Sequence, residues 1–155
     1  MNQPIETIRK TRLSLIEGVK DLRTAQLNEI PQGFNNNIIW NMGHLVAAMQ
    51  GLCYRRSGQA LTVPEDFFEI YKPGSRPQGP VTAEAVAMIK ELLLSSLDQL
   101  QEDLEQHAGR FAVYEGFVSR YGVPLNSIEA AVQFLPFHEG LHLGYIMAQK
   151  RVLSR

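Results

Sequence analysis

Several absences from the sequence narrow the classes of protein to which it can belong. It contains one cysteine, Cys53, so an intrachain disulfide is impossible, and a lone thiol suits a reducing compartment. No apolar stretch approaches the ~20 residues needed to cross a bilayer, and "MNQPIETIRK" at the N-terminus holds no apolar leader. The 15 basic and 16 acidic residues nearly balance, which argues against binding to nucleic acid or a membrane. We therefore expect a soluble, cytoplasmic protein with Cys53 as a small core residue.

Convincing strand patterns are also absent, and four segments show helical periodicity instead. Apolar residues spaced by three and four predict helices that begin after Pro4, after "GFNNN", at Thr82 and at Asn126. The second helix is expected to run from about Ile38 to Arg56. It is apolar nearly all round, which predicts that the other three helices enclose it.

Two long connections join these predicted helices. Residues 58–81 link the second and third helices and carry three aromatic residues that we expect to anchor the link: Phe67, Phe68 and Tyr71. Residues 109–125 link the third and fourth helices and are expected to hold a short helix or an extended piece. With no internal repeat and no domain boundary, residues 1–155 predict a single all-α domain, a four-helix bundle with long connections.

The fourth helix contains "HEGLH", which matches the H-E-x-x-H pattern of zinc proteases letter for letter. His138 and His142 lie one turn apart, on the stripe that also carries Leu135 and Tyr145, so both should point into the bundle. The long protease form of the motif would need glycine at 145 and histidine at 148, where the sequence has Tyr145 and Ala148. No acidic residue follows Glu139 either. A protease site therefore lacks its third ligand downstream.

Two inward imidazoles are costly to bury unless a metal ion or hydrogen bonds satisfy them, and this pattern alone leaves both possibilities open. Any third ligand must lie upstream. His107 lies at a polar helix end, where a solvated histidine is ordinary, so we expect it not to bind metal. His44 lies in the middle of the apolar second helix, beside small residues that leave room for an approaching group. Facing His138 and His142, it would complete a three-histidine site with an open coordination position.

These residues resemble the DinB/YfiT-like superfamily of metal-binding four-helix bundles. The resemblance rests on "IIWNMGHLVA", with Trp40 four residues before His44, and on "FHEGLHLGYI", with His138, His142 and Gly144. It covers essentially the whole chain. It implies an up-down-down-up bundle, frequently a homodimer, that holds a divalent ion through the three histidines.

Relatives of this kind include metal-dependent thiol transferases, while many members have no assigned reaction. The resemblance therefore implies an enzyme, a thiol S-transferase or a small-molecule hydrolase, that activates a thiol or water on zinc or nickel, with iron or manganese as alternatives. Its partner would be a small-molecule substrate such as a low-molecular-weight thiol. The alternative is a non-catalytic structural, sensor or interaction protein, which a fourth protein ligand on the metal would favour.

Three further residues are candidates for roles around the predicted metal site. Glu139 could act as a general base, although one residue from His138 it points about 100° away and could instead orient a histidine or face solvent or a dimer partner. Tyr145 could donate a hydrogen bond to substrate or be a core tyrosine. Asn41, about one turn before His44, could line the pocket or support a ligand from behind.

Overall fold

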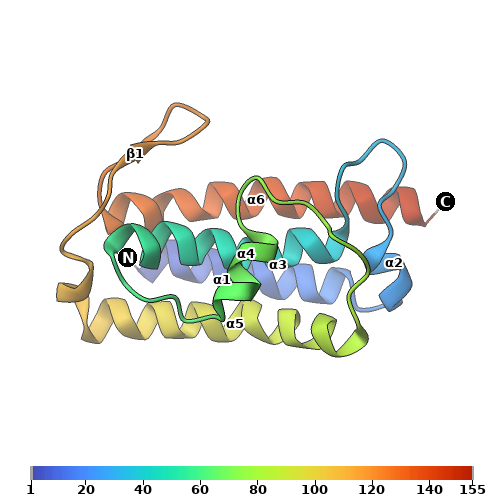
Figure 1. Ribbon diagram of the computed structural model, residues 1–155, viewed down its shortest axis with the longest axis horizontal. Coiled ribbons are helices and arrows are strands. Elements are labelled where there is room, and N and C mark those ends of the chain that lie inside the picture. Colours follow the sequence, from blue (N-terminus) through green and yellow to red (C-terminus); the bar gives the residue numbers. More distant parts are fainter. Residues whose placement is uncertain (1, 155) are drawn as a thin grey trace.

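The four segments with helical periodicity form four long helices, and the all-α prediction is confirmed (Figure 1). The computed structural model describes residues 2–154, and its long helices are α1 (Asn2–Gly18), α3 (Ile38–Met49), α5 (Ala83–Gln106) and α6 (Ile128–Leu153). In Figure 1, α1 and α6 run from left to right and α3 and α5 from right to left. Both α1 and α3 contact α5 and α6. Over residues 2–154, no helix combines the length and apolar character that a membrane crossing needs.

The helix starts follow from side chains that accept hydrogen bonds from the first turn. Asn37 precedes α3, and its side chain accepts from the Trp40 amide at 2.9 Å. Thr82 before α5 and Ser127 before α6 each accept from the amide three residues further on. The prediction that α6 begins at Asn126 is wrong by one position, because the hydroxyl of Ser127 provides this contact.

The second predicted helix is enclosed as expected, since every residue of α3 is buried. Its helical path continues through a π-helical turn, η1 (Gln50–Tyr54), and a short 3-10 turn, η2 (Arg55–Ser57). Gly58 then ends the helical path with a φ of 67°, in the left-handed region that glycine adopts without a Cβ penalty. The expected end near Arg56 and Gly58 is therefore confirmed.

The two long connections differ in structure. Residues 58–81 contain α4 (Glu65–Tyr71), and the three aromatic residues predicted to anchor them are buried. Residues 109–125 contain the end of a 3-10 turn, η3 (Ala108–Phe111), and a short hairpin of β1 (Phe117–Val118) and β2 (Pro124–Leu125). The first connection follows η2 directly. A further short helix, α2 (Thr24–Asn28), lies between α1 and α3. The short helix or extended piece expected over residues 109–125 is thus confirmed. The pairing of the extended segments was not predicted, because strands of two residues are too short to show a period.

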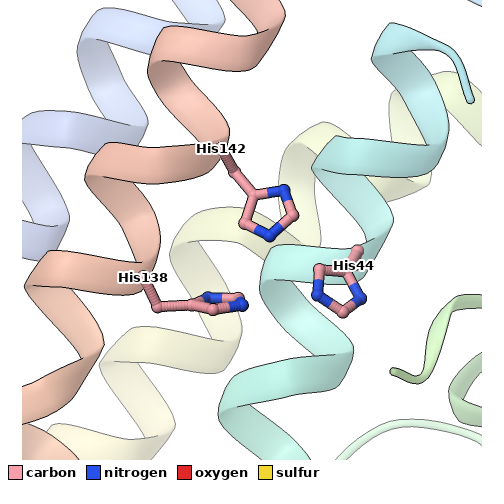
Figure 2. A group of neighbouring side chains, drawn as sticks. All are labelled: His44, His138 and His142. Atoms are coloured by element: carbon pink, nitrogen blue, oxygen red, sulfur yellow. The ribbon is translucent and has the colours of Figure 1, made fainter. Parts of the chain in front are cut away.

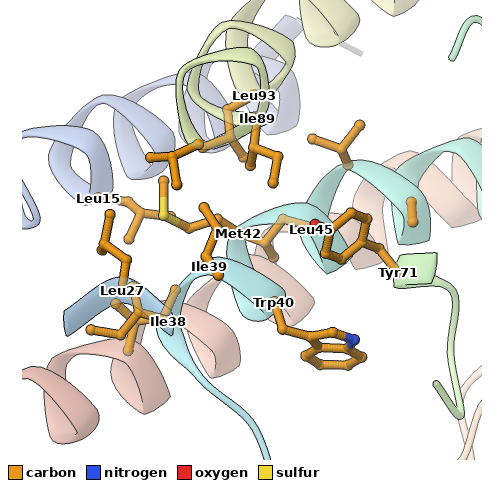
Figure 3. Packing of buried hydrophobic residues seen from close by; sticks show 14 of the residues in the cluster. Leu15, Leu27, Ile38, Ile39, Trp40, Met42, Leu45, Tyr71, Ile89 and Leu93 are labelled. Atoms are coloured by element: carbon orange, nitrogen blue, oxygen red, sulfur yellow. The ribbon is translucent and has the colours of Figure 1, made fainter. Parts of the chain in front are cut away.

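The apolar core fills the space between the long helices (Figure 3). Met42 and Leu45 of α3 pack with Leu15 of α1 and with Ile89 and Leu93 of α5, all at most 1% exposed. A second cluster continues the core toward the other end of the bundle and includes Cys53, which is fully buried as predicted. Burial raises the pKa of the Cys53 thiol to about 12. Its side chain therefore acts as a small apolar group.

A buried ion pair crosses this apolar core. Arg12 of α1 and Glu139 of α6 are both 0% exposed, and their Nη2 and Oε1 atoms lie 2.6 Å apart. The same guanidinium donates to the backbone carbonyl of Leu93 in α5 at 2.7 Å and to that of Leu45 in α3 at 3.2 Å. Burial raises the pKa of the Glu139 carboxyl, and the Arg12 charge opposes that shift. One side chain of α1 therefore binds to each of the other three long helices.

We expect Arg12→Met to lower the free energy of unfolding by about 3–5 kcal/mol, because it leaves the buried Glu139 carboxylate without its partner. Chemical denaturation of the purified variant measures this loss. The double variant Arg12→Met/Glu139→Leu should recover most of it. Arg9→Met is the matched control, since Arg9 pairs with the exposed Asp98 and should cost about 1 kcal/mol or less. Equal losses for the two arginine variants would contradict the role given to Arg12.

Candidate metal centre

Three histidines from two helices meet at one point in the bundle (Figure 2). His44 comes from the middle of α3, and His138 and His142 come from successive turns of α6. One ring nitrogen of each lies within 4.8 Å of the others, and the ring centroids are 4.6–5.2 Å apart. The predicted trio therefore assembles, and nitrogen atoms at this spacing can share one metal ion.

The ring of His44 is fixed on two sides. Its Nδ1 lies 2.8 Å from the backbone oxygen of Tyr71, which can only accept, so Nδ1 carries the proton and donates it. The indole of Trp40 stacks on the imidazole with ring centroids 4.8 Å apart and planes 11° from parallel. Ser75 in turn accepts from the Trp40 indole at 3.2 Å. These contacts leave the Nε2 lone pair of His44 available to a metal.

Gly43 makes the contact between Tyr71 and His44 possible. A Cβ atom at position 43 would lie 2.5 Å from the Tyr71 ring, closer than two such atoms can approach. The small residues beside His44 were predicted to leave room for an approaching group, and the aromatic side chains of α4 take that room. Phe68 packs against Gly51 less closely, since a Cβ there would lie 3.4 Å from its ring in ordinary contact. Glycine at 43 thus lets α4 pack close enough to bring a carbonyl to the metal ligand.

Asn41 forms a hydrogen bond with the outer ring nitrogen of His142. The Nδ1 atom of His142 lies 2.8 Å from Oδ1 of Asn41, a side chain that is fully buried one turn before His44. Of the two roles predicted for Asn41, the structure shows a hydrogen bond to a candidate ligand. With Nδ1 donating to this amide oxygen, His142 also presents Nε2 to the centre of the cluster.

His138 is the least satisfied of the three histidines. Among the described residues its Nδ1 atom is buried without a hydrogen-bond partner. Burial lowers the pKa of all three imidazoles from 6.5, to about 3 for His138 and about 4 for His142. The rings are therefore neutral near pH 7, as a metal ligand must be. His44 and His142 each bond through Nδ1, which leaves their Nε2 lone pairs for a metal, and a metal would also satisfy an imidazole of His138 that has no hydrogen-bond partner at Nδ1 among the described residues. The three rings together therefore fit a divalent ion.

Three other candidate residues lie outside this cluster. His107 is exposed at the C-terminal end of α5, as expected. Glu139 cannot serve as the general base considered for it, because both of its oxygens accept from Arg12. Nor does it face solvent or a dimer partner. Tyr145 was expected on the inward face of α6, but its side chain is 40% exposed and lies edge-on to Phe34.

Sequence reasoning missed several residues that shape the site. The partner of Glu139, Arg12, stands in a stripe of otherwise apolar inward positions on α1, and this break in the pattern was a usable signal. The Tyr71 carbonyl has none, because any residue supplies a backbone oxygen. Gln149 is also fully buried, and it lies close to Asn41. Its position seven residues after His142 places it on the same face of α6, but only the fold shows what it contacts.

Comparison with known proteins adds one finding. A family model described as the DinB superfamily matches residues 7–146, which include all three histidines. No curated protein matches the chain in sequence.

Replacing any one of the three clustered histidines should abolish firm metal binding. We expect His44→Ala, His138→Ala and His142→Ala each to lose more than the roughly 10–100-fold in affinity that removal of an outer hydrogen-bond partner costs. Elemental analysis after dialysis of the purified variants measures the retained metal. His107→Ala is the control and should retain the wild-type amount. Full metal content in His44→Ala would rule out the three-histidine site.

Gly43→Ala should weaken metal binding from a distance. The added methyl group must push the Tyr71 ring away from α3 and with it the carbonyl that holds His44, so we expect about a 10-fold loss of affinity. Overpacking should also cost about 1–3 kcal/mol of stability. A metal titration and a denaturation curve measure the two effects. The control is Gly140→Ala on α6, where a Cβ meets nothing within 4 Å; unchanged affinity in Gly43→Ala would contradict this account.

Proposed function

The chain belongs to the DinB superfamily, and on this basis we propose that it is a metal-dependent enzyme that activates a thiol or water at the three-histidine centre. A divalent ion supplies Lewis acidity at its open coordination position, where it lowers the pKa of a bound thiol or water. The reaction class is S-transfer from a low-molecular-weight thiol or hydrolysis of a small molecule. Zinc or nickel suits the three imidazoles best, and iron or manganese is an alternative.

The observation that carries this proposal is the composition of the cluster. Among the described residues, the histidine, cysteine and acidic side chains that gather there are His44, His138 and His142, with no fourth member. A structural zinc site ordinarily has four protein ligands, whereas a catalytic site has three and leaves one position for water or substrate. Three ligands therefore support catalysis over a purely structural role for the ion.

The charge around the cluster supports an anionic fourth ligand. The groups that bond to the outer nitrogens of His44 and His142 are a backbone carbonyl and a side-chain amide, both neutral. Glu139, the acidic residue next to His138, is already paired with Arg12. The ligands and these partners thus leave the charge of a divalent ion uncompensated, which favours binding of a thiolate or hydroxide.

The proposal also covers the roles of Tyr145 and Glu139, the oligomeric state and the cellular location. Tyr145 is exposed about one turn after His142, and we propose it as a hydrogen-bond donor to substrate. Glu139 has a positioning role in place of the catalytic role considered for it. The homodimer and the cytoplasmic location stay predictions from the sequence.

Cobalt-substituted protein tests the open position directly. We expect a small thiol such as cysteine or 2-mercaptoethanol to change the visible absorption of the bound cobalt, because a thiolate enters its coordination sphere. Turnover is then measured with a panel of thiols and electrophiles on protein of known metal content. Turnover should fall to the background rate in His138→Ala and persist in His107→Ala.

The outcomes separate the two classes of function. An unchanged cobalt spectrum at saturating thiol, together with no turnover across the panel, would indicate a closed, non-catalytic metal site. A spectral change that azide produces and thiols do not would favour a hydrolase over a thiol transferase. Metal retained after loss of any one histidine would contradict the site itself.

A further inference from the structure

A network of buried amides extends from His142 away from the metal centre. Asn41 of α3 and Gln149 of α6 are both 0% exposed, and Asn36 lies half-buried in the loop just before α3. Asn41 contacts the ring of His142, and Asn36 contacts both Asn41 and Gln149. Buried amides that are joined in this way have few free choices of orientation.

A backbone oxygen contributes to the direction of two of these amides. The Nδ2 atom of Asn41 lies 2.8 Å from the backbone oxygen of Asn37, which can only accept a hydrogen bond. The Nε2 atom of Gln149 likewise lies 2.9 Å from the backbone oxygen of Asn36. A reversed amide in either residue would place two oxygen atoms against each other in a buried site. The side-chain oxygens of Asn36 and Gln149 also accept from Nδ2 of Asn41, so these contacts together turn its Oδ1 atom toward His142.

Asn36 joins the two ends of the network. Its Oδ1 atom accepts from Nε2 of Gln149 at 2.9 Å and from Nδ2 of Asn41 at 2.8 Å. With both neighbours directed by backbone oxygens, a reversed Asn36 amide would bring its NH2 group against two others. The orientation of Gln149 thus reaches Asn41 by two routes: through Asn36, over two hydrogen bonds, and directly, because Oε1 of Gln149 accepts from Nδ2 of Asn41 at 3.4 Å.

Asn41, at the end of this hydrogen-bond network, determines which ring nitrogen of His142 holds the proton. Because Asn41 presents an oxygen at 2.8 Å, Nδ1 must carry hydrogen and Nε2 must carry the lone pair. A free neutral imidazole exchanges between both forms, and the form with hydrogen on Nε2 could not bind a metal there. The network selects the form that binds.

We propose that Gln149 and Asn36 are positioning residues, which hold the Asn41 amide in one orientation and so keep His142 in the tautomer that presents Nε2 to the metal. The proposal rests on the metal function proposed above, but the tautomer is a property of the metal-free chain. It gives a structural role to Asn36, in the asparagine run "GFNNN". It also explains a fully buried glutamine seven residues beyond the second histidine of "HEGLH".

Nuclear magnetic resonance of metal-free protein with 15N-labelled histidine tests the proposal at pH 7. Long-range proton–nitrogen correlations distinguish the two neutral tautomers, and we expect His142 to be the Nδ1–H form alone. In Gln149→Leu we expect the Nε2–H form to appear and the affinity for Zn²⁺, measured by competition with a chelator, to fall about 10-fold. Asn36→Ala is the second variant, since it removes the side-chain bonds of Asn36 to Gln149 and Asn41 at a half-buried position.

Gln50→Leu is the matched control. Gln50 is also a fully buried glutamine, but its amide bonds with Thr62 in the connection after η2 and does not contact the network. It should lose stability as Gln149→Leu does while keeping the wild-type tautomer and affinity. Equal effects of the two variants on the tautomer and on Zn²⁺ would reduce Gln149 to a packing role.

Two results would overturn the proposal. The first is an Nε2–H tautomer of His142 in the wild-type protein. The second is an unchanged tautomer and Zn²⁺ affinity in folded Gln149→Leu and Asn36→Ala. Neither result depends on catalysis. If instead the tautomer behaves as expected but thiols neither bind nor react, the proposed enzymatic function fails while the positioning role stands.

Discussion

The arrangement of the bundle depends on one buried ion pair, between Arg12 and Glu139. Arg12 of α1 donates to a carboxylate in α6 and to backbone oxygens in α3 and α5, so its guanidinium ties all four long helices together. Desolvating such a pair is costly, and similar apolar side chains could stabilise the fold as well or better. What the pair adds is a constraint on how α6 is rotated about its own axis. Glu139 faces Arg12, and in this same rotation of α6 His138 and His142 face His44.

A second constraint is close approach around α3. This helix is buried along its whole length, and Gly43 lets the Tyr71 ring lie against it, so that the Tyr71 carbonyl reaches His44. On the other side, the Asn41 amide holds His142. Both partners are neutral acceptors, so they orient the imidazoles without adding negative charge to the centre. The fold therefore holds the three imidazoles in a neutral environment, which would leave a bound divalent ion strongly electrophilic.

The "HEGLH" motif shows how one pattern can be partly informative. Its two histidines lie on one face of a helix in any protein, and the lack of a downstream ligand correctly directed the search to His44. The glutamate was a different matter. In a zinc protease it acts as a base, but here α1 supplies an arginine that occupies both of its oxygens. No feature within the five residues could have indicated that partner, which lies 127 residues away.

The sequence by itself determined the four helices, their approximate ends and the trio of histidines, because periodicity and capping are local and because few histidines were available as ligands. It placed Tyr145 inward by the same periodicity, and this was wrong, since the face of a helix that is covered depends on what packs against it. Only the tertiary structure decided that Glu139 meets Arg12, that a carbonyl of α4 holds His44, and that Gln149 contacts the asparagine that meets His142. These contacts join residues far apart in the chain, and apart from the charged residue that Arg12 places in the apolar stripe of α1, the local pattern does not indicate them.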